Sequence, residues 1–313
     1  MVEMIGNAPL IVDIKRHSLE DGPGIRSVVF FKGCPLCCVF CHNPETQNPE
    51  MEIAFSAREC IRCGECVKAC PEGAIDLGFP GRIRRDQCGR CGRCTSICPG
   101  KGLRPIGSYY PVEKLAGLLL RDYAFYRHSG GGVTLSGGEC TLYPDYLESL
   151  LDLLKARAVH VALETSGDFD FVPFEEKILP HIDLLYFDLK IADPSVHRKV
   201  TGRSNTRILD NFRRLLAVQP KKVNARVPVV PGITATRENF AAIVDFLYET
   251  GADRVSLLPY NPLGMEMHGS LGRPKPCLPD GFMTPNQETE IRILFQGIIA
   301  DKAGTRRRIP IST

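Results

Sequence analysis

The stretch GCPLCCVFCHNPE, from Gly33 to Glu45, places four cysteines within eight residues. Clustered cysteines serve as disulfide partners, zinc ligands or iron–sulfur ligands. Cys34, Cys38 and Cys41 have the spacing C-x3-C-x2-C. Three thiolates on a four-iron cluster leave one iron without a protein ligand, and an open metal position can bind a substrate. The spacing therefore predicts an iron–sulfur site that can do chemistry as well as carry electrons.

Cys37 is the remaining cysteine of this stretch. It could replace Cys38 as a ligand, but the spacing would then become C-x2-C-x3-C. We interpret Cys37 as a bystander. Twelve of the fourteen cysteines lie between Cys34 and Cys98, which marks a metal-rich segment within an otherwise ordinary chain.

Composition and charge limit the classes of protein that this chain can be. Its 313 residues are 43% hydrophobic, and its net charge is +3 from 39 basic and 36 acidic residues. So small a net charge argues against a nucleic-acid or anionic-membrane partner. No apolar run approaches the roughly 20 residues that span a bilayer, and residues 1–16 do not resemble an export signal. We expect a cytoplasmic protein, in which metal or redox chemistry is a commoner use of cysteine than disulfides.

Two arrays further along the chain repeat one cysteine pattern. CIRCGECVKACPEGAI and CGRCGRCTSICPGKGL both follow C-x2-C-x2-C-x3-C-P, the run of bacterial two-cluster ferredoxins, in which the fourth cysteine of each array ligates the other cluster. Zinc is the alternative, but zinc sites need neither the third cysteine nor the trailing Cys-Pro. The predicted ligand sets are Cys60, Cys63, Cys66 and Cys98 for one 4Fe-4S cluster and Cys88, Cys91, Cys94 and Cys70 for the second.

Outside this segment, short apolar runs alternate with amphipathic ones. The predicted strands are Ser27–Phe31, Val133–Ser136, Val159–Glu164, Leu184–Asp188, Lys222–Val230 and Arg254–Leu258. The predicted helices are Pro111–Arg127, Pro144–Arg157, Asn205–Val218, Arg237–Glu249 and Pro285–Ala300. Six β/α repeats predict an α/β fold, a partial (β/α)6 barrel with chemistry at the carboxyl ends of its strands. A doubly wound open sheet remains the alternative, because periodicity alone does not exclude it.

We expect residues 1–44 and 108–313 to form the barrel and residues 45–107 to form an inserted ferredoxin-like module.

The order of short motifs along the chain resembles the radical S-adenosylmethionine superfamily and, more narrowly, its activating enzymes of glycyl radical enzymes. The motifs are DGPGIR (Asp21–Arg26), KGCPLCCVFCHNPE (Lys32–Glu45), SGGGVTLSGGEC (Ser129–Cys140), ETSG (Glu164–Gly167), DLK (Asp188–Lys190), HRKVTG (His197–Gly202), VPVVPG (Val227–Gly232) and LLPYNPLG (Leu257–Gly264). The ferredoxin-like insert is typical of the longer members, unlike the pyruvate formate-lyase activator.

The resemblance implies a set of contacts to S-adenosylmethionine. The loop with Gly137, Gly138 and Glu139 would bind the methionine amine, and Lys190, assisted by Arg226, would pair with the methionine carboxylate. Further implied contacts are Phe40 to adenine, the backbone of His42, Asn261 to ribose, and Asp188 with Glu164 to a monovalent cation. An ion pair between strands is an equally good reading of Glu164.

The chain departs from the family pattern at two of these places. Cys140 stands where a proline usually follows Glu139, and Asn261 stands where some relatives carry histidine. An amide can donate and accept, so a ribose contact could survive at Asn261. His268 is a weaker candidate for that contact. The sequence assigns no role to Cys140 or Cys277.

The family reaction is the reductive cleavage of S-adenosylmethionine to methionine and a 5′-deoxyadenosyl radical, which abstracts hydrogen from one glycine of a large partner enzyme. The implied cofactors are three 4Fe-4S clusters, S-adenosylmethionine and a monovalent cation, and the implied electron donor is a flavodoxin or ferredoxin. Two other functions remain open at this stage. One is a radical enzyme that acts on another peptide or on a small molecule, and the other is a non-enzymatic polyferredoxin that carries electrons.

Overall fold

A nine-stranded sheet forms the centre of the molecule, with strand order β11-β10-β9-β8-β7-β6-β2-β1-β5. The computed structural model describes residues 8–304 and 307–312. Residues 1–7 of the predicted barrel segment 1–44, and residues 305–306 and 313 of the predicted barrel segment 108–313, lie outside the described part. The strands are β1 (Leu10–Ser18), β2 (Arg26–Phe31), β5 (Ser108–Tyr109), β6 (Gly132–Gly137), β7 (His160–Thr165), β8 (Leu184–Asp188), β9 (Val223–Val229), β10 (Val255–Pro259) and β11 (Ile311–Ser312). Strands β2, β6, β7, β8, β9, β10 and β11 are parallel, whereas β1 pairs antiparallel with β2 and β5.

The strand order separates the two folds that periodicity left open. From β2 through β6 to β10, each parallel strand lies beside the next one in the chain, without the reversal that defines a doubly wound sheet. The carboxyl ends of these strands therefore meet at one edge, which is where barrels of this type place their chemistry. The prediction of an α/β fold with a largely parallel sheet is confirmed.

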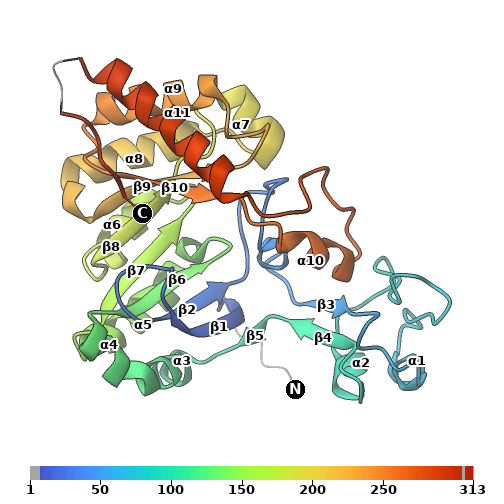
Figure 1. Cartoon of the computed structure of the whole chain (residues 1–313). Coiled ribbons are helices and arrows are strands. Elements are labelled where there is room, and N and C mark those ends of the chain that lie inside the picture. Colours follow the sequence, from blue (N-terminus) through green and yellow to red (C-terminus); the bar gives the residue numbers. More distant parts are fainter. Residues whose placement is uncertain (1–7, 305–306, 313) are drawn as a thin grey trace.

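Helices cover the outer face of the sheet (Figure 1). They are α3 (Val112–Leu119), α4 (Tyr123–Ser129), α5 (Pro144–Lys155), α6 (Phe171–Lys177), α7 (Pro194–Thr201), α8 (Thr206–Val218), α9 (Arg237–Thr250) and α11 (Pro285–Ala303). The short α10 (Gly264–Ser270) lies apart from them, against β3 and the 3-10 turn at Pro44–Thr46. Further 3-10 turns lie at Leu120–Asp122, Cys140–Leu142 and Pro220–Lys222. Leu150, Phe212 and Phe240, from three of these helices, are fully buried in one core with the apolar residues of the strands.

All six predicted parallel strands are present, with ends shifted by one or two residues at most. The predicted helix over 111–127 is instead two helices joined by a 3-10 turn at Leu120–Asp122. The turn carries the Asp122 side chain into the protein, where it accepts hydrogen bonds from Arg16 at 2.8 Å and Ser27 at 2.7 Å. These contacts to β1 and β2 are long-range, so no periodicity within the helix could reveal them.

The segment between the cysteine loop and α3 forms a small separate unit. It contains β3 (Glu52–Phe55), α1 (Glu65–Ala69), α2 (Arg93–Ser96) and β4 (Leu103–Ile106). Strands β3 and β4 pair antiparallel, from Glu52 opposite Ile106 to Phe55 opposite Leu103, so the two ends of the unit lie side by side. Figure 1 shows the unit at one side of the barrel, next to α10. Its hydrophobic cluster, which includes Ile53 and Ile83, is distinct from that of the barrel.

Candidate active site

The cysteine loop begins where β2 ends, at the carboxyl edge of the parallel sheet. Gly33 and Cys34 donate their backbone N–H groups to the carbonyls of Thr46 and Gln47, at 2.7 Å and 3.0 Å, so the loop closes on itself. Cys37 and Val39 donate to the carbonyls of Thr201 and Val200 at the end of α7. The HRKVTG motif therefore has a structural explanation, because its last turn holds the cysteine loop.

Cys34, Cys38 and Cys41 are packed against the barrel core, and their charges are mutually close enough to influence one another. Burial raises the pKa of Cys38 to about 11 and that of Cys41 to about 12, and it raises the pKa of Cys34 well above its ordinary value. Thiols of this kind stay protonated unless a metal displaces the proton, which is how metal ligation couples to protonation. Cys37 is exposed, and its Cβ lies 3.7 Å from the position that a Cβ on Gly202 would take.

The glycines of the loop after β6 are required by the protein backbone itself. Gly137 has φ +108°, and a Cβ on it would lie 2.3 Å from the nitrogen of Phe31. A Cβ on Gly138 would lie 2.2 Å from the carbonyl oxygen of Gly33. Any side chain would therefore push the β6 loop away from the cysteine loop, and the two glycines bring these loops into contact.

The Glu139 side chain is buried among polar groups at the carboxyl end of β7. Its carboxylate accepts from Thr141 Oγ1 at 2.7 Å, from Thr165 Oγ1 at 2.9 Å and from both the N–H and Oγ of Ser166, at 2.8 Å and 2.6 Å. The residue is fully buried, and desolvation raises its pKa against the pull of these hydrogen bonds. Glu139 therefore ties the β6 loop to the ETSG motif, which leaves the backbone of the loop as the part available to a ligand.

Four adjacent strands contribute a continuous chain of polar contacts at the same edge. Ser136 donates to Glu164 at 2.6 Å, and Arg226 donates to Glu164 at 2.5 Å and to Asp188 at 2.9 Å. Lys190 completes the chain, with Nζ 2.8 Å from the other oxygen of Asp188. We call Glu164, Asp188, Lys190 and Arg226 the charged row. Its two carboxylates face two cations, and all four side chains are at least four-fifths buried.

Asp188, Lys190 and Arg226 of the charged row keep their charges at neutral pH. Desolvation alone would raise the pKa of Asp188, but Arg226 and Lys190 lower it to about 2. Desolvation alone would lower the pKa of Lys190, yet the charge of Asp188, with that of Cys38, raises it. Lys190 thus lies within electrostatic reach of the cysteine loop and presents a fixed positive charge beside it.

The ion-pair alternative for Glu164 is what the structure shows. Among residues 8–304 and 307–312, no three His, Cys, Asp or Glu side chains are close enough together to ligate a single metal ion. Glu164 and Asp188 instead have Arg226 as their shared counter-ion.

The remaining predicted contacts lie on or beside the cysteine loop. Phe40 is buried in the barrel core. His42 is accessible to solvent; desolvation by the neighbouring protein atoms lowers its pKa, while Glu164 and Asp188 oppose that shift. Asn261 accepts at Oδ1 from the N–H of Leu263 at 2.9 Å, just before α10. A Cβ on Gly264 would lie 2.6 Å from the Cα of His42, so the segment with Asn261 is pressed against the cysteine loop.

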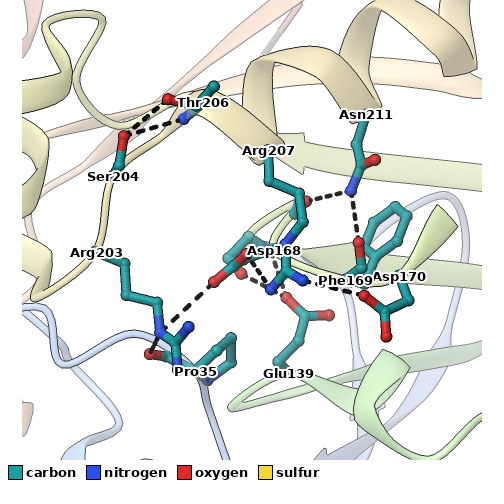
Figure 2. Close-up of polar contacts among 12 residues, drawn as sticks. Pro35, Glu139, Asp168, Phe169, Asp170, Arg203, Ser204, Thr206, Arg207 and Asn211 are labelled. Atoms are coloured by element: carbon teal, nitrogen blue, oxygen red, sulfur yellow. Dashed lines mark hydrogen bonds and ion pairs between the residues drawn. The ribbon is translucent and has the colours of Figure 1, made fainter.

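The sequence did not reveal a second support of the cysteine loop, which comes from the residues just after α7. Figure 2 shows Arg203, after α7, reaching the carbonyl oxygen of Pro35, with Asp168 between Arg203 and Arg207. Arg203 Nε lies 2.9 Å from that oxygen, and Arg207 donates to Asp168 at 2.6 Å. Asp168 follows the ETSG motif directly, so this contact joins β7, α8 and the residue next to Cys34. No local pattern links these positions, which are far apart in the chain.

The eight cysteines of the small unit fall into two spatial sets. Cys60, Cys63, Cys66 and Cys98 line one pocket together. The pKa of Cys94 is raised to about 11 by burial and by the neighbouring charges of Cys88, Cys70 and Cys91. Each set thus combines three cysteines of one array with the fourth of the other. His268, in α10, is buried without a hydrogen-bond partner on either ring nitrogen and lies outside both sets.

Three family models match the chain. The Radical SAM superfamily matches residues 89–247, the 4Fe-4S dicluster domain matches residues 59–102, and the 4Fe-4S single cluster domain matches residues 20–72. These matches confirm iron–sulfur clusters and S-adenosylmethionine as cofactors of the family. No helix in the described part of the chain is long and apolar enough to cross a membrane.

Several curated relatives align over most of the chain. The trans-4-hydroxy-L-proline dehydratase activating enzyme of Clostridioides difficile is 38% identical, over 92% of this chain and 96% of its own length. The benzylsuccinate synthase activating enzyme of Thauera aromatica is 41% identical, over 85% and 82%, and the isethionate sulfite-lyase activating enzyme of Desulfovibrio desulfuricans is 39% identical, over 85% and 88%. Because these relatives are activating enzymes, the non-enzymatic carrier is excluded.

Solved structures agree on the fold. A radical SAM methyltransferase from Sphaerobacter thermophilus superimposes with a TM-score of 0.52 at 13% identity, covering 97% of this chain and 76% of that one. Streptococcus suis SuiB bound to precursor peptide SuiA gives 0.51 at 17% identity, covering 66% and 43%. Fold, motifs and relatives agree: the chain belongs to the radical SAM superfamily and, within it, to the activating enzymes of glycyl radical enzymes.

Proposed function

We propose that this protein uses its cysteine loop and charged row to cleave S-adenosylmethionine and to activate a partner enzyme at one glycine. The observation that carries the proposal is the meeting of three thiols packed against the barrel core with a fixed Lys190 charge at the carboxyl edge of the parallel sheet. When bound, a 4Fe-4S cluster with one open iron supplies the electron and the chelation site for the sulfonium compound. The protein supplies grip and orientation.

Each part of the site has a distinct proposed role. Cys34, Cys38 and Cys41 hold the open-iron cluster. The Gly137–Glu139 backbone receives the methionine amine, and Lys190 receives the methionine carboxylate, because its raised pKa keeps the ammonium charged. Arg226 holds Asp188, which in turn aims Lys190.

The adenosyl group would lie over the cysteine loop. Phe40 and the backbone of His42 would flank the adenine. The Asn261 amide nitrogen would donate to the ribose, since its oxygen is used by Leu263. A monovalent cation beside Glu164 and Asp188 would have to share them with Arg226.

We further propose that residues 45–107 form a module with two 4Fe-4S clusters, giving three clusters in all. The ligand sets are Cys60, Cys63, Cys66 and Cys98, and Cys88, Cys91, Cys94 and Cys70. The cysteines of the first set line one pocket, and in the second set the charges of Cys88, Cys70 and Cys91 act on Cys94. Both observations support this division of the cysteines into two ligand sets. The module would pass electrons from a flavodoxin or ferredoxin to the open-iron cluster, in the reducing cytoplasm.

The partner is a large glycyl radical enzyme whose glycine loop enters the barrel mouth. By their names, the relatives activate trans-4-hydroxy-L-proline dehydratase, indoleacetate decarboxylase, isethionate sulfite-lyase, benzylsuccinate synthase and choline trimethylamine-lyase. Similarity to the family therefore does not select one partner enzyme for this chain. The product of a neighbouring gene is the partner to test first.

The test is anaerobic. The reconstituted protein, S-adenosylmethionine and dithionite should give 5′-deoxyadenosine and methionine, and a candidate partner should acquire a glycine-centred doublet in electron paramagnetic resonance. Partner protein labelled with deuterated glycine should transfer deuterium to 5′-deoxyadenosine. Cleavage of S-adenosylmethionine without deuterium transfer, and without a glycine-centred doublet in the partner, would favour the alternative of a radical enzyme acting on another peptide or a small molecule.

A further inference from the structure

Arg82 is buried in the ferredoxin-like module and lacks a carboxylate partner within the described residues. Only 5% of its surface is exposed, and its Nε and Nη1 atoms are buried without hydrogen-bond partners. Its guanidinium carbon lies 5.2 Å from the centre of the Phe55 ring. Burying an unpaired cation is unfavourable, so a buried arginine of this kind requires an anion beside it.

The pocket that Arg82 faces supplies the place for that anion. Arg82 lines it together with Cys60, Cys63, Cys66 and Cys98. Its Nη2 lies 3.8 Å from Cys60 Sγ, within the range of a hydrogen bond to sulfur. A 4Fe-4S cluster with four thiolate ligands carries a net negative charge, so its binding would pair the guanidinium. The residues therefore fit the group.

The backbone shows that this placement is imposed by the fold. Arg82 has φ +63°, a left-handed conformation that side chains other than glycine rarely adopt. The conformation is held by hydrogen bonds from the Arg82 N–H to the Phe79 carbonyl at 2.9 Å and from the Asp76 N–H to the Arg82 carbonyl at 3.0 Å. The turn thereby directs the Arg82 side chain inward. Arg84, two residues further along the chain, points outward and pairs with Asp76.

The other cysteine set has a nearby cation too, but among the described residues no cationic side chain donates to its sulfurs. Arg85 is the basic residue whose charge lies near Cys88 and Cys94; its Nε is buried without a partner, and both of its terminal nitrogens donate to backbone carbonyls, those of Ile53 and Ser270. The hydrogen bonds that this set receives come from the backbone, as from the Ala74 N–H to Cys70 Sγ at 3.2 Å. The two ligand sets therefore differ in the cationic side chain that donates to a sulfur, which the described residues supply to the Cys60 set through Arg82, although the sequence repeat makes the sets look alike.

We propose that Arg82 is the counter-ion and hydrogen-bond donor of the cluster held by Cys60, Cys63, Cys66 and Cys98, and that it raises the reduction potential of this cluster above that of its twin. Positive charge and hydrogen bonds to the sulfurs stabilise the reduced, more negative state of a cluster. An electron entering the module thus rests preferentially on the Arg82 side. The proposal rests on the two-cluster module proposed above.

The test is a potentiometric titration of the full chain, followed by electron paramagnetic resonance, with Cys34, Cys38 and Cys41 replaced by alanine so that only the module clusters contribute. Arg82→Met should lower the more positive midpoint by about 59 mV or more, a tenfold change in the electron-sharing constant between the clusters, and leave the other midpoint in place. Arg82→Lys, which keeps the charge, should shift it less. The matched control is Arg84→Met, which should shift neither.

Iron content separates the possible failures. Fewer than eight irons in the parent protein would refute the two-cluster module itself. Equal shifts of both midpoints, or no shift in fully loaded Arg82→Met, would overturn the role of Arg82. If Arg82→Met loses iron, Arg82→Gln carries the same test, because it keeps N–H donors without the charge. Loss of iron in both variants would overturn the potential-setting role and leave a structural one.

Discussion

Lys32 Nζ lies 2.8 Å from a carboxylate oxygen of Glu52, and this contact joins the barrel to the ferredoxin-like module. Lys32 directly follows β2, two residues before Cys34, and is fully buried, whereas Glu52 begins β3 of the module. The second oxygen of Glu52 accepts from Arg273 at 2.6 Å, and Arg273 also donates to the carbonyl of Pro44. The module is thereby fixed to the root of the cysteine loop by buried charges.

Glu52→Gln should loosen this attachment. The substitution leaves the Lys32 cation buried without a carboxylate, a change that typically costs about 3–5 kcal/mol. We expect faster hydrogen exchange in β3, β4 and the end of β2, together with a lower unfolding temperature. The exposed Glu59→Gln is the control. Equal exchange in the two variants would show that the charges do not fix the module.

Arg226→Met should be strongly destabilising by itself. It leaves Glu164 and Asp188 without their shared cation, which typically costs about 3–5 kcal/mol for a buried pair. Adding Glu164→Gln removes one uncompensated charge and should restore part of the loss. Urea unfolding of the single and double variants measures the coupling. If the changes in unfolding free energy of the single variants simply added up in the double variant, the residues of the charged row would not interact.

Glu139→Ala should weaken the hold of the β6 loop on S-adenosylmethionine without removing a direct contact. The buried N–H of Ser166 would lose its acceptor, at a cost of about 1–3 kcal/mol. We expect lower stability and a higher Kd for the sulfonium compound in equilibrium binding. Glu148→Ala, on the surface of α5, should change neither quantity. Unchanged binding by a folded Glu139→Ala protein would separate the loop from the ligand.

Two glycines of α10 give a matched pair. A Cβ at Gly264 would meet the backbone of Cys41 and His42 within 2.7 Å, whereas Gly269 has nothing within 4 Å. Gly264→Ala should cost about 1–3 kcal/mol through overpacking and should displace Asn261 from the cysteine loop. Gly269→Ala should be neutral or slightly stabilising. Thermal unfolding and the KM for S-adenosylmethionine measure the contrast, and equal effects of the two substitutions would contradict it.

Cys37→Ala and Cys38→Ala should differ in iron content. The exposed Cys37 is held against α7 through its backbone, so its replacement should leave the open-iron cluster intact. Replacement of the buried Cys38 should remove one cluster, about four irons. Iron analysis and the spectral response to added S-adenosylmethionine check this. Loss of iron in Cys37→Ala alone would reverse the ligand assignment.

The parallel strands and the cysteine arrays were predictable because both are local signals. Strands such as Val133–Ser136 are short apolar runs, and the ferredoxin pattern lies within each array. The antiparallel β1 was missed, because its mixture of apolar and charged residues gives no clear period. The short α10 was also missed, because seven residues with two glycines carry a weak helix signal.

The site was predictable in its members but only partly in their contacts. Family motifs pointed to Lys190 and Arg226, yet the bridge from Arg226 to Glu164 and Asp188 depends on the register of β7, β8 and β9. Arg82 escaped notice for a related reason. Arg82 is distinguished by its burial and its backbone conformation, neither of which the sequence shows. In the sequence it is one of many basic residues near cysteines.

The pairing of β3 with β4 has an evolutionary consequence. Since Glu52 lies opposite Ile106, the chain leaves the barrel and returns to it at nearly the same point. A gene could therefore acquire or shed the whole ferredoxin-like module in one recombination event, with a short turn in its place and no strand of the barrel displaced. Long and short members of one lineage are the natural outcome of such a junction.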